Sequence, residues 1–362
     1  LTVVMRDDVP PHRGERLFVG LQHARIYHGK ERIETRELPI PDPLPGEVIA
    51  KTLYTGICGT DVHSYFGETI FGKVFPFHIG HEICARVTAV GDGVQTVAPE
   101  DIIVVNPFFT CGACTPCYMG QENGCEHKTT IGLKGFGGFS DYVRVPATSA
   151  FPVHSDNYPA MSLAEPLSTV IYGYEKLRTA PTQRVLIQGI GSIGLMFLQL
   201  AARTGFTQIV VSDFSHEKLS IAKQLGADLA LCPLDDADKQ TLDALSHRGF
   251  DIIIDCTGSI KSMQTTVDRL AFGGQILLFG LCSAELSMEI KPFRLYQKDA
   301  SLMTSFALTK HSFRKAIAML ENGQINTELL IDSVRPRAQL EQSILDISQG
   351  RSAGKIIIDT CL

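Results

Sequence analysis

The sequence lacks several features that would place it in well-defined classes of protein. It contains no run of eighteen apolar residues, which argues against a membrane-spanning helix. It has no block of lysine and arginine, and its formal net charge of −6 makes nucleic acid and anionic membranes poor partners. The first sixteen residues mix charges with prolines and have no apolar h-region, so they do not resemble a signal peptide. No internal repeat appears.

The composition is that of a globular chain of two ordinary domains. Of its 362 residues, 44% are hydrophobic and 20% are charged. Ten cysteines could form disulfides, but four cluster at metal-ligand spacing and the other six are scattered. For a chain of this length without a secretion signal, we favour metal ligation and a reducing, cytoplasmic compartment.

The cysteine cluster is the most specific metal signal in the chain. Its members follow the pattern C-x2-C-x2-C-x7-C and are Cys111, Cys114, Cys117 and Cys125. Four thiolates can surround one tetrahedral Zn²⁺ and leave no open position, which is typical of a structural rather than a catalytic zinc. The sequence therefore predicts a zinc-pinned lobe and raises the question of a second, open site.

The hydrophobic pattern changes near Glu165. Up to about residue 150, short apolar runs alternate with proline and glycine turns, which indicates an irregular all-β domain. From Glu165 to about residue 308, strand-like runs alternate with helix-like runs, which predicts a parallel sheet with right-handed crossovers. We expect an α/β protein with one domain formed by residues 1–166 and 309–362 and a second formed by residues 167–308.

Particular segments carry this interpretation. In the first part the expected strands are 47–50, 83–90, 101–105 and 139–145. In the second part the expected strands are 184–188, 208–212, 251–255 and 275–279, with helices ending at Arg203 and covering 218–225. A helix at 312–321 and a strand at 355–359 are expected to return to the first domain.

A glycine-rich turn follows the strand at 184–188. The segment 189–194 reads G-x-G-x-x-G and opens a helix, which is the context that a dinucleotide site needs. Gly189 permits the tight turn, Gly191 lets the backbone approach a pyrophosphate, and Gly194 allows close packing of helix and strand. Ser192 and Ile193 begin the helix, whose N-terminal N–H groups and dipole favour an anion.

Asp213 ends the next strand, 19 residues after Gly194. A carboxylate at this position can accept hydrogen bonds from both ribose hydroxyls and would repel a 2′-phosphate, which favours NAD over NADP. No arginine follows directly. The alternative is a structural role, in which Asp213 or Ser215 caps the following helix.

Four further residues suggest an open zinc site. They are Cys58, His81, Glu82 and Glu165, the last at the expected domain junction. A catalytic zinc takes about three protein ligands and one exchangeable oxygen, and cysteine, histidine and carboxylate all qualify. Taken singly, each residue is more often structural or solvated, so the hypothesis depends on their occurrence together with the dinucleotide turn.

With these motifs in view, the chain resembles the zinc-dependent medium-chain alcohol/polyol dehydrogenases, in particular the sorbitol dehydrogenase-like branch. The matching segments occur in the family's order over nearly the whole chain, and they are 58–63, 80–82, the cysteine quartet, 165–166 and 189–194. The resemblance implies a GroES-like irregular β-barrel joined to a Rossmann domain. It also implies two zinc ions per chain, NAD, and a homodimer or homotetramer.

The resemblance assigns roles to the open site. Cys58 and His81 would be direct ligands, and Asp61 would fix the tautomer of His81. Glu82 is the third ligand in the sorbitol dehydrogenase-like branch and stands off the metal in others. Glu165 occupies the position where yeast- and liver-type alcohol dehydrogenases use a cysteine, and in the polyol branch it binds the metal or holds a water. Which glutamate is the third ligand stays open.

The expected activity is oxidation of a secondary hydroxyl in a polyol, sugar alcohol or cyclitol. Zinc would lower the pKa of the bound hydroxyl, and Thr60 and His63 would pass its proton outward. Two alternatives remain: threonine-type oxidation of an amino alcohol, and a non-catalytic zinc scaffold of the same fold. Segment 58–63 also resembles the threonine group, but Glu165 fits that group less well.

Overall fold

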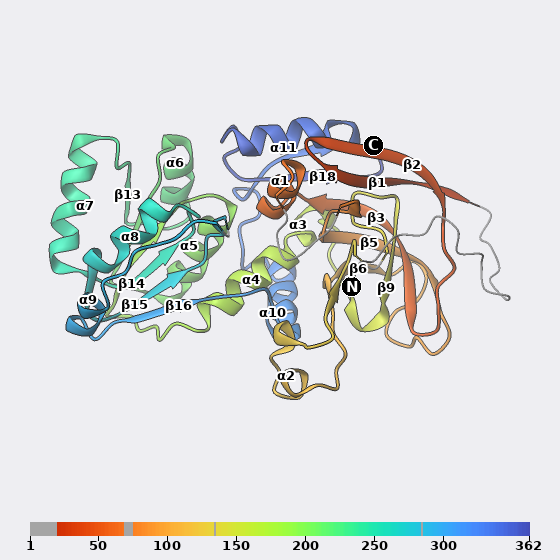
Figure 1. Ribbon diagram of the computed structural model, residues 1–362, viewed down its shortest axis with the longest axis horizontal. Helices are drawn as coiled ribbons and strands as arrows, with labels where there is room; N and C mark the ends of the chain where they lie inside the picture. Colours follow the sequence, from red (N-terminus) through yellow and green to blue (C-terminus); the bar gives the residue numbers. More distant parts are fainter. Residues whose placement is uncertain (1–19, 69–74, 134, 284) are drawn as a thin grey trace.

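The structure is a computed structural model that describes residues 20–68, 75–133, 135–283 and 285–362. Figure 1 shows a parallel sheet with its helices on the left and a mainly antiparallel β structure on the right. Between them lie α4 (Ala164–Tyr174) and α10 (Lys310–Glu321). Residues 1–19 of the predicted first domain lie outside the described residues. Among the helices that the structure describes, none is long and apolar enough to cross a membrane.

The right-hand part is built on one large sheet. In spatial order its strands are β10 (Ala150–Pro152), β6 (Ile102–Val105), β5 (Glu82–Val90), β3 (Glu47–Gly56), β18 (Lys355–Asp359) and β17 (Ile331–Pro336), while β9 (Tyr142–Pro146) also pairs with β3. Strand β18 is antiparallel to β3. The last strand of the chain therefore lies beside one of the first, and this brings residues some 300 positions apart into the same neighbourhood.

Smaller elements complete this part. A three-stranded sheet contains β2 (Arg32–Pro39), β1 (Leu21–Gly29) and β4 (Phe77–His78), and a two-stranded one contains β7 (Phe108–Phe109) and β8 (Thr129–Thr130). The 3₁₀ turn η2 (Ala147–Ser149) precedes β10. The strand predicted at 139–145 begins only at Tyr142, because the backbone N–H of Ser140 closes a turn onto the Gly137 carbonyl.

The left-hand part contains a parallel sheet. Its spatial order is β13 (Leu229–Leu231), β12 (Gln208–Ser212), β11 (Arg184–Gln188), β14 (Phe250–Asp255), β15 (Leu270–Leu278) and β16 (Ser301–Thr304), and every pairing is parallel. Buried apolar runs such as that of β11 are typical of strands covered on both faces. The predicted fold class, with a GroES-like β domain and a Rossmann sheet, is confirmed.

Helices cover both faces of the parallel sheet. One face carries α5 (Ser192–Thr204) and α6 (His216–Gln224), and the other carries α7 (Asp236–Arg248) and α8 (Ile260–Arg269). Successive residues of a strand point to opposite faces, so Ile187 belongs to the core cluster that contains Phe197 of α5, whereas Leu186 belongs to the cluster that contains Leu242 of α7. The short helix α9 (Pro292–Gln297) precedes the edge strand β16.

One continuous apolar core joins the two parts. It includes Val104 of β6, Leu167 of α4, Phe313 of α10 and Ile187 of β11, all buried. Helix α3 (Tyr158–Met161) contributes Met161 to the same core. Because α4 begins next to the β structure and lies in this core, its first turn, which carries Glu165, is firmly positioned.

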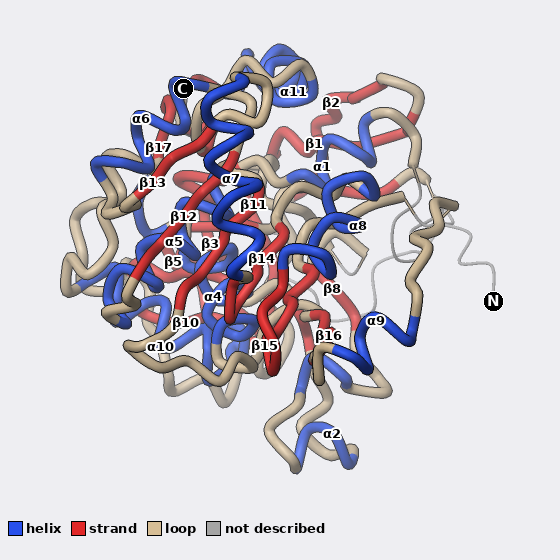
Figure 2. Tube along the Cα trace, turned by 90° about the vertical axis from the view of Figure 1, so that its left-hand side faces the viewer, coloured by secondary structure: helices blue, strands red, loops and turns tan. Residues whose placement is uncertain are grey.

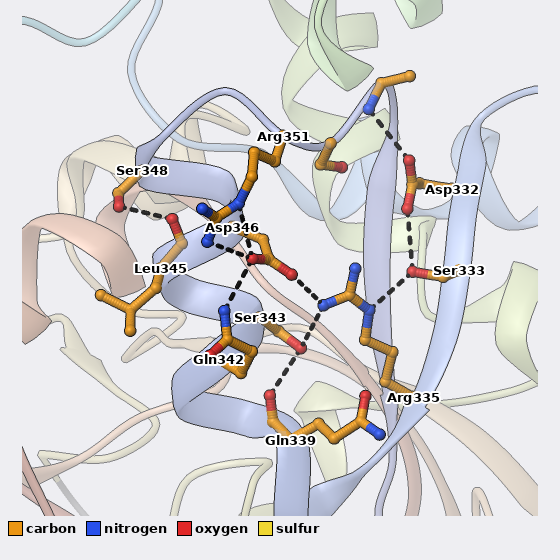
Figure 3. A network of polar contacts seen from close by, with 12 residues as sticks. Asp332, Ser333, Arg335, Gln339, Gln342, Ser343, Leu345, Asp346, Ser348 and Arg351 are labelled. Carbon is orange, nitrogen blue, oxygen red and sulfur yellow. Dashed lines mark hydrogen bonds and ion pairs between the residues drawn. The ribbon is translucent and has the colours of Figure 1, made fainter.

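A polar network fixes the last helix. Figure 3 shows Asp346 of α11 (Leu340–Ser348) between Arg335 of β17 and Arg351. Its carboxylate accepts hydrogen bonds from Arg335 at 2.6 Å, from Arg351 at 2.7 Å and from Gln342 at 2.9 Å. The turn η3 (Arg337–Gln339) leads into α11, so the network holds the whole segment against β17.

This network predicts a pH-dependent contribution to stability. The hydrogen bond from Arg335, followed by those from Gln342 and Arg351, holds the pKa of Asp346 well below its usual range. A depressed pKa stabilises the fold above the unfolded value of about 4, and the contribution is lost as the pH falls below it. In urea unfolding at pH 7, Asp346→Asn should therefore be less stable than the wild type, and the difference should shrink at acid pH. A difference independent of pH would contradict this, and Asp92→Asn at an exposed turn is the control.

Candidate functional site

The four clustered cysteines converge in a lobe at the bottom of Figure 1. The lobe contains α2 (Thr115–Tyr118) and the 3₁₀ turn η1 (Glu122–Gly124). Cys111 and Cys125 have their Sγ atoms 3.5 Å apart, as do Cys114 and Cys117, and the Cys111–Cys117 distance is 4.0 Å. Zinc–sulfur bonds of about 2.3 Å in a tetrahedron place the sulfurs about 3.8 Å apart. The quartet therefore fits one closed zinc site.

Without a cation, the thiols of the quartet differ in pKa. The backbone N–H of Ala113 lowers the pKa of Cys111 to about 6, whereas burial raises that of Cys117 to about 12. Bringing four thiolates this close costs energy unless a cation compensates them. All ten cysteines lie in the described part of the chain, and none forms a disulfide.

A second group of potential ligands lies where α1 (Gly59–Tyr65) meets β5. Cys58 caps the N-terminus of α1, and His81 and Glu82 stand at the start of β5. The ligand atoms of these three residues lie within 4.8 Å of one another. The structure thus brings together three of the four residues predicted for the open zinc site.

Asp61 connects two of these ligands. Its Oδ2 accepts the backbone N–H of Cys58 at 2.9 Å, and its Oδ1 lies 3.6 Å from Nδ1 of His81. Burial lowers the pKa of His81, but the Asp61 carboxylate and the Cys58 thiol together outweigh burial and raise it well above its usual value. Asp61 therefore stands where it can orient the His81 ring, as the resemblance implies.

The two carboxylate oxygens of Glu82 have different surroundings. Its Oε1 accepts a hydrogen bond from Nζ of Lys355 at 2.6 Å, and Lys355 also donates to the Ile57 carbonyl at 3.1 Å. Its Oε2 is buried without a hydrogen-bond partner among the described residues. A buried carboxylate oxygen without a donor is costly, and a cation beside Cys58 and His81 would compensate it. The group therefore fits a metal ion.

Glu165 lies outside this tight group. It stands in the first turn of α4 and is buried. Burial raises the pKa of Glu165 to about 7, and His81 opposes this shift while Glu82 adds to it. Glu165 therefore interacts electrostatically with His81 and Glu82. The group whose ligand atoms lie within 4.8 Å of one another nevertheless consists of Cys58, His81 and Glu82.

The two predicted relay residues share helix α1. Thr60 and His63 are three positions apart, which places them on neighbouring parts of one helix face. Nδ1 of His63 lies 2.8 Å from Oε2 of Glu68, a carboxylate that is half exposed. The helix therefore provides a hydroxyl two positions after Cys58 and an imidazole that lies beside a half-exposed carboxylate.

The glycine turn has the geometry that its pattern requires. Gly189 has a φ of +86°, and a Cβ at Gly194 would lie 2.0 Å from the Gly189 carbonyl oxygen, so neither position admits a larger residue. A Cβ at Gly191 would meet open space. The turn leads into Ser192 and Ile193, the first residues of α5. The site thus leaves room for a pyrophosphate beside Gly191 and the helix N-terminus.

Asp213 follows β12 at the same edge of the sheet. Its Oδ2 accepts the backbone N–H of Ile190 at 2.7 Å, and its Oδ1 accepts that of Ser215 at 3.0 Å. Each carboxylate oxygen keeps further lone pairs for a ribose hydroxyl. The residue therefore braces the glycine turn and the start of α6 in addition to its predicted role.

Family comparisons agree with this site. Residues 44–155 match the model of the alcohol dehydrogenase GroES-like domain, and residues 192–322 match that of the zinc-binding dehydrogenase. An L-galactonate-5-dehydrogenase of Escherichia coli is 30% identical over 309 residues, which cover 85% of this chain and 89% of the relative. The chain belongs to the zinc-dependent medium-chain alcohol/polyol dehydrogenase family.

Other members of this dehydrogenase family are similar over almost the full length. A D-arabinitol dehydrogenase of Uromyces fabae is 29% identical over 344 residues, covering 93% of this chain and 97% of the relative. A solved structure from Sinorhizobium meliloti, described as a zinc-binding dehydrogenase bound to NADP, is 27% identical with a TM-score of 0.86. It covers 94% of this chain and 99% of its own.

Two residues with candidate functional roles in this family member were not predicted from the sequence. Lys355 is buried at the open site, and the signal for it was a lysine directly before three isoleucines in the last strand. The carboxylate of Glu68 lies within hydrogen-bond distance of His63, but an isolated glutamate in a loop carries no recognisable sequence signal.

A third set of ligand-type atoms in this dehydrogenase does not fit a metal. His216, Cys232 and Asp235 have atoms within 4.8 Å of one another. His216 and Asp235 are exposed and stand at the N-termini of α6 and α7. Both helix ends carry positive dipole charge, which disfavours a cation.

Proposed function

We propose that this chain oxidises a secondary hydroxyl of a polyol, sugar alcohol or cyclitol to a ketone, with NAD as hydride acceptor. The observation that carries the proposal is the group of Cys58, His81 and Glu82, with the unpartnered Glu82 oxygen among them. A zinc ion held by these residues would supply a Lewis acid. The geometry supports Glu82 as the third ligand and Glu165 as the group that stands beyond it.

The residues of α1 account for the proton that leaves with the hydride. Hydride transfer to NAD converts the secondary alcohol to a ketone and releases one proton. Thr60 would accept a hydrogen bond from the reacting hydroxyl, and His63 would pass the proton to Glu68 and then to water. Glu165 is buried beside the site, where a carboxyl with a pKa of about 7 can hold a water in either protonation state.

A substrate panel tests this proposal. The zinc-loaded protein with NAD should produce NADH from one or more of D-arabinitol, sorbitol, xylitol, L-galactonate and myo-inositol, and a chelator should stop the reaction. Faster oxidation of L-threonine would favour the amino-alcohol alternative instead. If no polyol, cyclitol, amino alcohol or simple alcohol reduces NAD or NADP, the non-catalytic scaffold becomes the better interpretation.

Cofactor preference depends on Asp213. The carboxylate would accept hydrogen bonds from the ribose and repel a 2′-phosphate. We expect Asp213→Asn to reduce the preference for NAD over NADP by about tenfold, because the charge is lost while one acceptor for the Ile190 N–H remains. The ratio of kcat/KM for the two cofactors measures this. The control is Glu217→Gln in the first turn of α6, and an unchanged ratio in Asp213→Asn would contradict the ribose role.

The assembly is proposed to be a homodimer or homotetramer, without nucleic acid or membrane partners. Strand β16 is the last in the spatial order of the parallel sheet. Beside it in sequence, α9 exposes Phe293 and Tyr296, whose rings stack at 6.2 Å. Unpaired strand edges and exposed aromatic rings favour association. Light scattering should show an oligomer that Phe293→Asp weakens, and a wild-type monomer would contradict it. A cytoplasmic location is proposed as well, because four thiolates that hold a zinc ion require a reducing compartment.

A further inference from the structure

The lobe that carries the cysteine quartet contacts a distant segment of the chain. Residues 305–309 connect the edge strand β16 to α10. The side-chain Nδ2 of Asn123, in η1 of the lobe, donates a hydrogen bond to the carbonyl oxygen of Phe306 at 2.8 Å. Asn123 is 9% exposed, although it belongs to a lobe that projects from the molecule in Figures 1 and 2. The bond joins positions 183 residues apart.

Lys128 strengthens the same contact. Its Nζ donates to the backbone carbonyl of Asn123 at 2.6 Å. The same ammonium lies 4.6 Å from the centroid of the Phe306 ring and 5.4 Å from that of Phe108. A partly desolvated cation between two rings is an attractive arrangement. Lys128 thus holds Asn123 in place and contacts the segment to which Asn123 bonds.

The contacted segment has a backbone that requires external support. Ala307 has a φ of +58°, a left-handed conformation that is unfavourable for a residue with a side chain. The Oγ of Ser305 is buried without a hydrogen-bond partner among the described residues. The neighbouring contacts at Phe306, which come from the lobe, help to stabilise this conformation.

The segment also lies at the ligand-binding edge of the parallel sheet. In doubly wound sheets, ligands bind outside the carboxyl ends of the strands, and the two halves of the sheet each take one half of a dinucleotide. Asp213, after β12, assigns the adenosine half to β11–β13. The half formed by β14–β16 then receives the nicotinamide, and residues 305–309 directly follow the carboxyl end of β16.

We propose that Asn123 and Lys128 are positioning residues for the nicotinamide half of the cofactor. They couple the four-cysteine lobe to cofactor binding by fixing residues 305–309 at the sheet edge. The lobe then has a second task besides its own stability, because its fold determines the shape of the nicotinamide site. This inference rests on the proposed NAD-linked function.

Affinities for NADH and for ADP-ribose test the proposal. ADP-ribose lacks the nicotinamide, so it reports on the adenosine half and the pyrophosphate turn alone. Asn123→Ala and Lys128→Met should each weaken NADH binding by about fivefold to tenfold, the effect of one lost hydrogen bond, and leave ADP-ribose affinity unchanged. Calorimetric titration of the zinc-loaded protein gives both values. Gln121→Ala, at an exposed amide of the same lobe, should change neither.

The outcomes separate the possible explanations. NADH affinity that is unchanged in Asn123→Ala and Lys128→Met would overturn the inference and leave the proposed function intact. Equal losses for NADH and ADP-ribose would also overturn it, because general destabilisation weakens both. If Asn123→Ala loses zinc, Lys128→Met decides the question at full zinc content. A wild-type protein that binds ADP-ribose but not NADH would contradict the proposed function itself.

Discussion

Replacing Cys58 by serine is expected to lower kcat for polyol oxidation by at least about a thousandfold while the protein stays folded. Cys58 is one of three potential ligands within 4.8 Å, and serine is a much weaker ligand for zinc than a thiolate. Lewis-acid assistance is worth several kcal/mol, and each ~1.4 kcal/mol corresponds to a factor of ten in rate. The zinc content should fall from two ions per chain to one, with an unchanged circular dichroism spectrum.

The matched control is Cys111→Ser in the quartet. It should also reduce the zinc content from two to one, but its kcat at saturating cofactor should stay within about tenfold of the wild type, since a four-thiolate site has no open position. Its main effect should be a lower thermal midpoint, because the lobe loses its cross-link. Two variants with the same zinc content and opposite effects on chemistry would separate the two metal sites. Full activity in Cys58→Ser would refute the assignment of the open site.

The features that the sequence predicted well are those encoded in short segments. The quartet spans fifteen residues and the glycine turn six, so local spacing alone specifies their geometry. The strands at 184–188 and 208–212 were predicted with their observed ends, because both are buried on two faces and flanked by turn residues. The position of Asp213 beside the glycine turn could also be predicted, because Asp213 follows the next strand, 19 residues after Gly194.

Other elements could not be predicted because their patterns are weak. Strand β2 has no buried residue, so it lacks the alternation of apolar and polar residues that marks a strand. Its strand conformation depends on its pairing with β1. Strand β13 is only three residues long. The dependence of residues 305–309 on the lobe arises from a hydrogen bond across 183 positions, which no local pattern contains.

The different positions of Glu82 and Glu165 also could not be predicted from the sequence. In the sequence, both glutamates were assigned to the site only through the resemblance. The distance from a carboxylate to a cysteine and a histidine is a tertiary property that no local pattern contains. The pairing of Gly56 with Glu82 across β3 and β5 places Glu82 beside Cys58, and a Cβ on Gly56 would lie 2.0 Å from Oε2 of Glu82. Glu165 comes from α4, which packs in the shared core, and it is not a member of the group whose ligand atoms lie within 4.8 Å of one another.

The second large effect is expected at Lys355, which sequence inspection did not single out. Replacing it by methionine should destabilise the metal-free protein by about 3–5 kcal/mol, because it leaves the fully buried Glu82 carboxylate without its cation. Both partners are almost inaccessible, with side-chain exposures of 4% for Lys355 and 0% for Glu82. Urea unfolding of the metal-free wild type and variant gives this difference directly.

A double mutant shows whether charge or packing is responsible. Lys355→Met combined with Glu82→Gln removes both charges, so it should be more stable than Lys355→Met alone despite carrying one more substitution. Lys315→Met provides the surface comparison, because Lys315 pairs with Glu175 where both side chains are well exposed, and its loss should cost at most about 1 kcal/mol. If Lys355→Met costs no more than Lys315→Met, the buried pair does not stabilise the site. If Lys355→Met is the more costly change, β18 supplies the counter-charge for Glu82, the proposed zinc ligand at the start of β5.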